Sequence, residues 1–319
     1  MIEQIQKLLD DMFKKTTGFD FDKYMKRFYC TKWMLISDYC LDDRNKANDV
    51  ITFSILPYYD SFENIKKVID GIAPKDIKNT RHINKAFIDF LKSNLMFHIS
   101  FLLGRNNQSL LKDWSKEVIV SGLEEIKTLL EEWKENTPGN IDYYNEVDKR
   151  VNIILSDMKS KGYNLKLIQR LLLTCFLAAY IGNKIFEKAE STEIIGWFSD
   201  RDALLTKHKN VASDLFHINF HGLTGNSDAI KIVIGKPNDD SKAMWYDELN
   251  KLPDYITGVI ADWDMDKNTV THEKFSEVLK DVVADNPNIS ILKLYKAQNG
   301  NWTCVRILPS NEDKNDGNC

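Results

Sequence analysis

The sequence predicts an α/β protein in which a mixed sheet carries a large all-α insertion. Three observations lead to this prediction: two strand-like segments close to the N-terminus, nearly unbroken helical periodicity in the middle, and alternating helices and strands afterwards. We expect an α/β core formed by two separate segments, with the helical insertion between them and a flexible tail. The predicted boundaries are 1–60 and 191–309 for the core, 61–190 for the insertion and 310–319 for the tail.

The first sixty residues contain the clearest strand signals. Residues 1–30 show the pattern of an amphipathic lead helix followed by a polar, aromatic stretch. Segments 33–40 and 50–57 are rich in β-branched and aromatic residues, and side-chain character alternates along the second. The polar residues 42–49 between them fit the loop of a long hairpin.

Helical spacing dominates from about 61 to 190, with breaks near 137–140 and 161–164. Residues 165–188 are apolar nearly all round, which predicts a central helix. The longest apolar run, 171–181, is too short to cross a membrane. Beyond 190 the predicted order is strand, helix, strand, two helices and two strands. These elements are expected at 193–199, 201–216, 229–235, 253–264, 272–284, 290–296 and 302–308.

Composition narrows the class of protein only in part. The 319 residues carry a formal net charge of −4, whereas a protein that coats nucleic acid is usually basic. The five cysteines are an odd number without CxxC spacing, which disfavours a disulfide framework or a cysteine zinc site. No secretory leader pattern begins the chain, so we expect a cytoplasmic protein, and the Lys-, Asn- and Ile-rich composition is typical of a bacterial source.

Three aspartates lie where elements of the predicted core begin or end. Asp38 and Asp200 each follow a strand-like run, and Asp254 follows Pro253 at the expected start of a helix, where the helix dipole is positive. Mg²⁺ and Mn²⁺ prefer such hard carboxylate oxygens. The sequence therefore predicts a divalent-metal site of Asp38, Asp200 and Asp254, with Asp202 and Asp262 as further candidate ligands. Aspartates in these places also serve as ordinary turn and cap residues, and that alternative stays open.

The order of these elements resembles the ribonuclease H-like fold, in particular an uncharacterised bacterial branch of that superfamily. The segment 252–258 (Leu-Pro-Asp-Tyr-Ile-Thr-Gly) is similar to the closing helix of that branch, and the resemblance covers about 33–73 and 190–265. It implies a nuclease site on the first strand and the closing helix. The branch usually has Asp-Glu-Ser-Gly on the first strand where this chain has Asp38-Tyr39-Cys40-Leu41, so one carboxylate is absent or is replaced by Asp42 or Asp43.

Two other patterns compete with the carboxylate site. Asp262, Asp264, Asp266 and Glu273 have the ligand spacing of an EF-hand loop, but Lys267 replaces the glycine that the sharp turn needs. Arg201 and His208 have the spacing of a metal-independent ribonuclease pair. Three further patterns fit a structural role better than a functional one: the His217/His221 pair, Cys175 and the Trp245-Tyr246 cluster. We expect these side chains to pack against other residues of the protein.

Phosphate-binding, dinucleotide-binding and α/β-hydrolase motifs are absent from the sequence. The leading hypothesis is a metal-dependent nuclease or phosphodiesterase that uses Mg²⁺ or Mn²⁺ and binds nucleic acid through Lys and Arg of the insertion. The alternative is a non-catalytic protein with a decayed site, which binds a protein partner through the helical insertion. Neither hypothesis involves a membrane.

Overall fold

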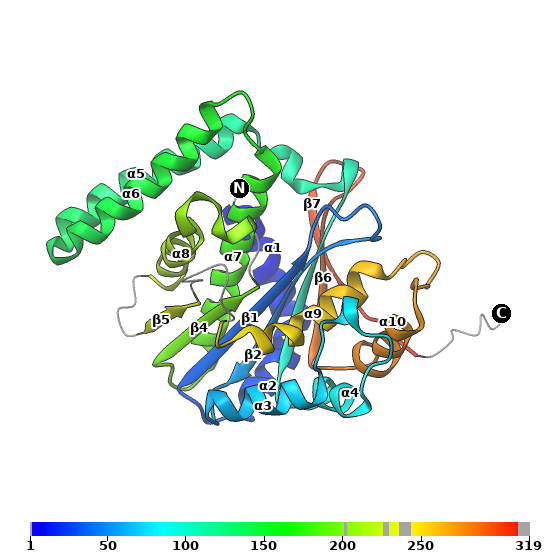
Figure 1. Cartoon of the computed structure of the whole chain (residues 1–319). Helices are drawn as coiled ribbons and strands as arrows, with labels where there is room; N and C mark the ends of the chain where they lie inside the picture. Colours follow the sequence, from blue (N-terminus) through cyan, green and yellow to red (C-terminus); the bar gives the residue numbers. More distant parts are fainter. Residues whose placement is uncertain (1, 201–202, 226–229, 236–243, 312–319) are drawn as a thin grey trace.

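A seven-stranded mixed sheet forms the centre of the molecule in the computed structural model, which describes residues 2–200, 203–225, 230–235 and 244–311 (Figure 1). The strand order across the sheet is β5-β4-β1-β2-β3-β6-β7. The strands are β1 (Lys32–Cys40), β2 (Asp49–Pro57), β3 (Phe97–Leu103), β4 (Ile194–Ser199), β5 (Lys231–Ile234), β6 (Ile289–Lys296) and β7 (Trp302–Ile307).

Strand directions divide the sheet into two antiparallel units joined by parallel pairs. β2 runs antiparallel to both of its neighbours, β1 and β3, and β6 and β7 form a second antiparallel pair. β4 is parallel to β1, β5 is parallel to β4, and β6 is parallel to β3. The C-terminal ends of β1 and β4 therefore reach the same edge of the sheet, beside each other.

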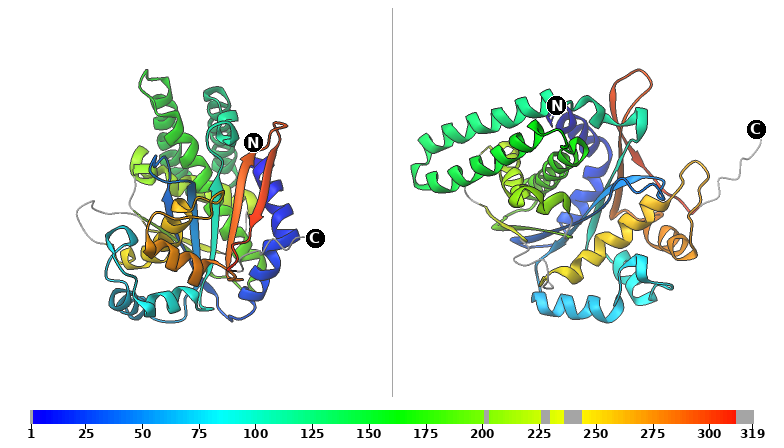
Figure 2. Two further views of the ribbon diagram at one scale, coloured as in Figure 1. Left: turned by 90° about the vertical axis from the view of Figure 1, so that its right-hand side faces the viewer. Right: turned by 45° about the horizontal axis from the view of Figure 1, so that its top comes forward.

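Helices cover both faces of the sheet, as the two turned views in Figure 2 show. One face packs against α1 (Ile2–Met12), α2 (Gly18–Met25), α7 (Leu165–Lys188) and α8 (Ala203–Thr224). The other face packs against α3 (Phe62–Ile72), α4 (Lys85–Lys92), α9 (Asp247–Asp262) and α10 (Glu273–Val278). We call the second one the α9 face.

Alternation along the central strands assigns side chains to these two faces. In β1, Trp33 and Leu35 belong to the α7 core, whereas Met34 and Ile36 belong to the core beneath α9. Both sets are buried, so the strand is apolar throughout. Asp38 follows Ile36 by two positions, and strand geometry therefore points it to the α9 face.

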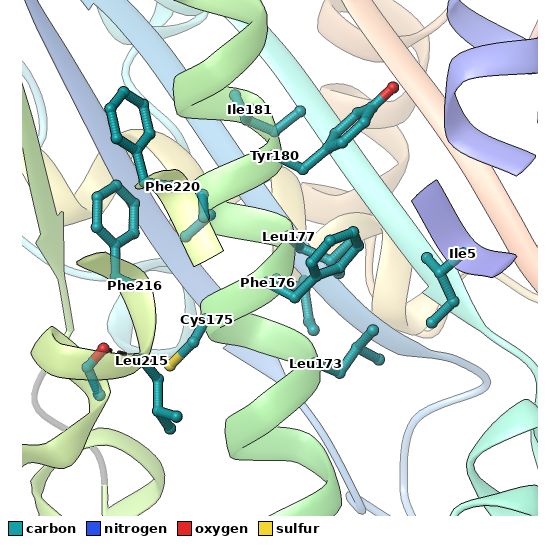
Figure 3. Packing of buried hydrophobic residues seen from close by; sticks show 14 of the residues in the cluster. Ile5, Leu173, Cys175, Phe176, Leu177, Tyr180, Ile181, Leu215, Phe216 and Phe220 are labelled. Atoms are coloured by element: carbon teal, nitrogen blue, oxygen red, sulfur yellow. Dashed lines mark hydrogen bonds between the residues drawn. The ribbon is translucent and has the colours of Figure 1, made fainter. Parts of the chain in front are cut away.

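The predicted central helix is confirmed as α7. Figure 3 shows its side chains between Ile5 of α1 on one side and Phe216 and Phe220 of α8 on the other. Cys175 is fully buried there, and burial raises the pKa of its thiol far above the usual range, as expected for a cysteine that only packs. This is the one helix of the described residues long and apolar enough to span a membrane. Because 72% of its apolar window is buried inside the protein, it has the character of a core helix.

A long helical hairpin projects from the body of the protein (Figure 1). It consists of α5 (Lys116–Asn136) and α6 (Ile141–Lys159), and α6 also contacts α8. Apolar residues of the two helices pack against each other, including Leu123, Leu130 and Val147. We call this segment the α5–α6 arm.

The prediction that 61–190 is entirely helical is wrong at β3, which lies inside that range. β3 is buried along its whole length between β2 and β6, so both faces are apolar enough to hide the two-residue period of a strand. The insertion between sheet strands is therefore shorter than expected and consists of α5, α6 and α7. The other strands lie within two residues of their expected bounds.

Candidate functional site

The register of β1 and β4 brings Asp38 and Asp200 together. Ser37 pairs with Ser199, and the Asp200 backbone N–H donates to the Ser37 carbonyl oxygen at 3.3 Å. The next residue on each chain is the aspartate, and neighbouring strands are about 4.8 Å apart. Asp38 is half-buried, whereas Asp200 is exposed at the edge of the sheet. The backbones at Asp38 and Asp200 are therefore neighbours, near the C-terminal ends of β1 and β4.

Helix α9 brings the third carboxylate over the same end of β1. Its Thr257 hydroxyl donates to the Asp38 carbonyl oxygen at 3.5 Å. Asp254 lies one turn before Thr257 on α9 and is half-buried. The predicted start of this helix is wrong, because α9 begins at Asp247 and Pro253 lies inside it. The Asp254 carboxylate is therefore in the middle of the helix, away from the positive end of its dipole.

Electrostatic effects connect the three aspartates. Burial raises the pKa of Asp38 well above its usual range, and the charges of Asp254 and Asp200 raise it further. The pKa of Asp254 is raised to about 6, mainly by burial, with a further contribution from the charge of Asp200. Carboxylates that oppose each other's ionisation are close together and would be stabilised by a bound cation.

A fourth aspartate, which the sequence did not indicate, lies beside this group. The charge of Asp76 raises the pKa of Asp254, whereas Lys78 and the hydrogen bond from the Ile77 backbone lower it. That bond joins the Ile77 N–H to Asp254 Oδ2 at 2.9 Å. Asp76 belongs to a stretch that we expected to be helical, and its Pro-Lys-Asp-Ile context contains no signal of a site.

A row of polar side chains continues from Asp38 across the α9 face of the sheet. Asp38 pairs with Thr52 of β2, which in turn pairs with Ser100 of β3. The Thr52 and Ser100 hydroxyls are fully buried and lie 2.9 Å apart. Hydroxyl groups beneath a helix are costly unless they are paired, so these two stabilise each other beside the carboxylates.

The two further candidate ligands do not add to this group. Asp202 lies outside the described residues. Asp262 lies eight residues beyond Asp254, which is about 12 Å along a helix. Its carboxylate binds Lys46 Nζ at 2.8 Å and the Thr271 backbone N–H at 2.6 Å. Asp262 thus fixes the end of α9 to the β1–β2 loop and to the segment before α10.

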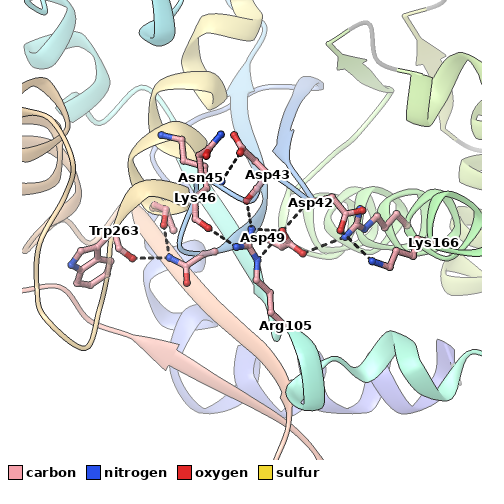
Figure 4. Close-up of polar contacts among 11 residues, drawn as sticks. Asp42, Asp43, Asn45, Lys46, Asp49, Arg105, Lys166 and Trp263 are labelled. Carbon is pink, nitrogen blue, oxygen red and sulfur yellow. Dashed lines mark hydrogen bonds and ion pairs between the residues drawn. The ribbon is translucent and has the colours of Figure 1, made fainter.

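The carboxylates proposed to replace the missing residue of the first strand have structural partners instead (Figure 4). Asp42 forms ion pairs with Arg170 and Lys166 of α7, and Asp43 accepts the Asn45 backbone N–H at 2.8 Å. Both belong to the hairpin loop that follows β1. Tyr39, which stands where the resembled branch has Glu, donates or accepts a short hydrogen bond with Ser199 on the α7 face.

The EF-hand pattern folds into a compact turn. Asp264 and Thr269 form a β-bridge, and Asp264 accepts the Lys267 backbone N–H at 3.1 Å and its ammonium group at 3.0 Å. Asp262 binds Lys46, so two of the four carboxylates of the pattern, Asp262 and Asp264, are directed to protein donors. Calcium ligation, in contrast, needs them to converge.

The histidine patterns also lie in packed surroundings. His208 is buried and its Nε2 atom is 3.0 Å from the Asp157 carboxylate, whereas Arg201 lies outside the described residues. The His221 ring packs edge-on against Trp133 and is stacked near His217, as expected for packing histidines. Trp245 contacts Phe62 and Phe198 with half of its surface exposed, at the edge of the core.

Comparison with known proteins adds no family to this description, since no family model, no curated protein and no solved structure matches the chain. Among the described residues, no three His, Cys, Asp or Glu side chains are already positioned to hold a metal ion. The donor set around Asp38 nevertheless fits a hard divalent cation, because every candidate ligand is a carboxylate oxygen. The fold class shown here is an α/β protein with a seven-stranded mixed sheet.

Proposed function

We propose that this protein is a divalent-metal-dependent nuclease or phosphodiesterase whose metal ligands are Asp38, Asp200 and Asp254. One observation carries the proposal: Asp38, Asp200 and Asp254, far apart in the sequence, meet at the end of β1 and β4, and the charge of Asp200 raises the pKa of both Asp38 and Asp254. Burying like charges together destabilises a fold. A bound cation would offset that cost, which makes the arrangement reasonable for a metal site.

The residues present fit Mg²⁺ or Mn²⁺ and the hydrolysis of a phosphodiester. The bound ion would supply an activated water and neutralise the charge that develops on the phosphoryl oxygens. Asp38 lies on a central strand, and the Thr257 hydroxyl donates to its backbone carbonyl oxygen. Asp200, at the exposed edge, faces the side from which a substrate would approach.

The arrangement of the elements supports the ribonuclease H-like assignment that the sequence resemblance implies. β1 carries the first aspartate and pairs with β2 as a hairpin, and β4 carries the second and lies parallel to β1. The helix with the third aspartate follows β5 and crosses β1 and β2. Strands β6 and β7 extend the sheet beyond β3, outside the region that the resemblance covers.

Calorimetry with Mn²⁺ and Mg²⁺ tests the proposal directly. The wild type should bind Mn²⁺, and the Asp38→Asn/Asp254→Asn variant should lose that binding, because both changes remove a ligand charge but keep the side-chain shape. Asp89→Asn, which changes an exposed carboxylate on α4, is the matched control and should bind like the wild type. Persistent Mn²⁺ binding by the double variant would contradict the assignment.

A second candidate function is supported by the α5–α6 arm. The arm projects from the body and exposes Val118, Ile141 and Tyr143, which are 37%, 39% and 45% accessible. Projecting helices with apolar residues on their surface are typical of protein-interaction segments. A wild type that binds no Mn²⁺, either alone or with an oligonucleotide present, would favour this non-catalytic role over the nuclease.

A further inference from the structure

A basic loop lies directly beside Asp254. The loop, residues 75–82, connects α3 to α4 and exposes Lys75, Lys78, Arg81 and His82, with Asp76 as its one acidic residue. This concentration of cationic side chains contrasts with the net charge of −4 of the whole chain. A local basic surface on an acidic protein is what recognition of a polyanion requires.

The backbone of the basic loop is held in place by three side chains from other elements. Asp254 accepts the Ile77 N–H, and the Tyr255 hydroxyl donates to the Lys75 carbonyl oxygen at 2.9 Å. Lys274 of α10 donates to the carbonyl oxygens of Ile77 at 2.7 Å and Thr80 at 2.8 Å. Because the anchoring groups bind backbone atoms, the cationic side chains of the loop are left facing outwards on a fixed support, which lowers the entropic cost of binding.

The loop is close enough to act on the same ligand as the carboxylates. Ile77, the residue before Lys78, donates its backbone N–H to the Asp254 carboxylate at 2.9 Å, so the loop is in direct contact with the proposed site. At its far end the loop borders a surface depression of about 370 Å³. The depression is lined by Arg81, His82, Lys274 and Lys280, together with Ser276, Glu273, Glu277 and Asp281. Its three Lys and Arg side chains are matched by three carboxylates, so the excess of positive charge belongs to the loop itself.

We propose that the basic loop binds the phosphodiester backbone of a nucleic acid strand next to the phosphate that lies at the carboxylates. The proposal rests on the proposed function for the position of that phosphate. Lys75, Lys78 and Arg81 would each contact the strand, and His82 would add a donor. The α5–α6 arm is a poor alternative, because six Lys and Arg stand against ten Asp and Glu between 116 and 159. The loop lies within 61–190, so it narrows our expectation that Lys and Arg of the predicted insertion hold the strand.

Binding of a fluorescein-labelled 20-nucleotide single strand, measured by anisotropy in EDTA over a range of salt concentrations, tests the proposal without any metal. The test variant is Lys75→Gln/Lys78→Gln/Arg81→Gln. The matched control is Lys14→Gln/Lys15→Gln/Lys26→Gln, which removes three exposed charges near α1 and α2 on the opposite side of the sheet. Each phosphate contact contributes about 0.7 to the slope of log K against log salt for a single strand. We expect the test variant to lose about 2 units of slope and at least about tenfold in affinity.

The outcomes separate this proposal from the metal assignment. The control should bind the oligonucleotide like the wild type, and the loop variant should bind Mn²⁺ like the wild type in calorimetry. Wild-type affinity and slope in the loop variant, or an equal loss in the control, would overturn the proposal even if the metal site is real. Oligonucleotide binding that depends on the loop in a protein without Mn²⁺ affinity would support the loop and refute the metal site.

Discussion

The carboxylate of Asp254 accepts the backbone N–H of Ile77 at 2.9 Å, which joins helix α9 to the loop between α3 and α4. This bond uses Oδ2 of Asp254, so Oδ1 is the oxygen that would bind a cation in the proposed site. Asp254 thus combines a structural contact with the position of a metal ligand, and the two roles respond differently to substitution. An amide in its place keeps an acceptor for Ile77 but loses the charge, whereas a methyl group loses both.

Asp254→Asn should therefore abolish Mn²⁺ binding and leave the fold intact at neutral pH. The raised pKa of Asp254 means that its ionisation destabilises the folded state. Removing the charge should raise the free energy of unfolding at pH 7.5 by up to about 2 kcal/mol, with little change below pH 4, where the native carboxyl is protonated. Denaturant unfolding at both pH values measures this difference.

Asp254→Ala is the control for the structural contact. It removes the acceptor of the Ile77 N–H as well as the charge, so it should be less stable than Asp254→Asn by about 1 kcal/mol at either pH. Equal stability of the two variants would mean that the hydrogen bond to Ile77 contributes nothing. If Asp254→Asn were clearly less stable than the wild type at pH 7.5, the claim that the ionised Asp254 carboxylate destabilises the folded state would be wrong.

Mn²⁺ binding should weaken as the pH falls through about 6. The pKa of Asp254 is about 6 and that of Asp38 is raised well above its usual range, so protons compete with the metal for both carboxylates. In the absence of metal, these groups stabilise the folded state below pH 4, and this contribution is lost as the pH rises through 6. Added Mn²⁺ should compensate at pH 7 and above.

Calorimetry in two buffers of different ionisation enthalpy measures the affinity for Mn²⁺ and the number of protons released when Mn²⁺ binds. At pH 6 the binding heat should depend on the buffer, because protons are released from the carboxylates, and at pH 8 this dependence should be smaller. Affinity that stays constant between pH 5 and 8 would show that the titrating carboxylates do not hold the ion.

The sequence was most informative where a strand ends at a clear turn. β1 and β2 were predicted because alternating residues flank a polar hairpin loop, and Asp38 could be placed at the strand end from that pattern alone. β3 was missed because neighbouring strands bury it on both sides and its polar residues, His98 and Ser100, are buried as well. No periodic signal remains in such a strand.

The candidate site was likewise predictable only where local sequence patterns mark it. Asp38 and Asp200 end strands, and strand ends are visible in the sequence. The position of Asp254 on α9 was wrong, because a proline normally marks the first turn of a helix and here Pro253 lies inside one. The neighbour Asp76 comes to Asp254 through tertiary contacts of its loop with α9 and α10, which no local pattern encodes.

Asp49 should be important for the stability of the β1–β2 hairpin. Its buried carboxylate accepts the Asp42 backbone N–H at 2.9 Å and pairs with Arg105 at 2.6 Å and Arg170 at 3.3 Å (Figure 4). Asp49→Ala leaves two half-buried guanidinium groups without their shared partner and should cost about 2–4 kcal/mol. Urea unfolding measures it, with Asp266→Ala, an exposed carboxylate, as the control that should change stability by less than about 0.5 kcal/mol.

Gly258 of α9 should resist substitution because of the loop beneath it. A Cβ atom there would lie 2.9 Å from Cγ2 of Ile77, a β-branched side chain that cannot turn away. Gly258 therefore lets this part of α9 approach the loop closely. In a helix, Gly→Ala normally stabilises by about 1 kcal/mol.

Gly258→Ala should therefore lower the free energy of unfolding by about 1 kcal/mol in spite of the better helix propensity, because Ile77 must move. Gly122→Ala in α5 is the matched control, since nothing lies within 4 Å of its added Cβ, and it should stabilise the protein. If the midpoint of thermal unfolding falls for Gly258→Ala and rises for Gly122→Ala, the loss of stability comes from the contact between α9 and the loop. If Gly258→Ala were as stabilising as Gly122→Ala, Ile77 would not be held against α9, and Asp254 would have no fixed loop to anchor.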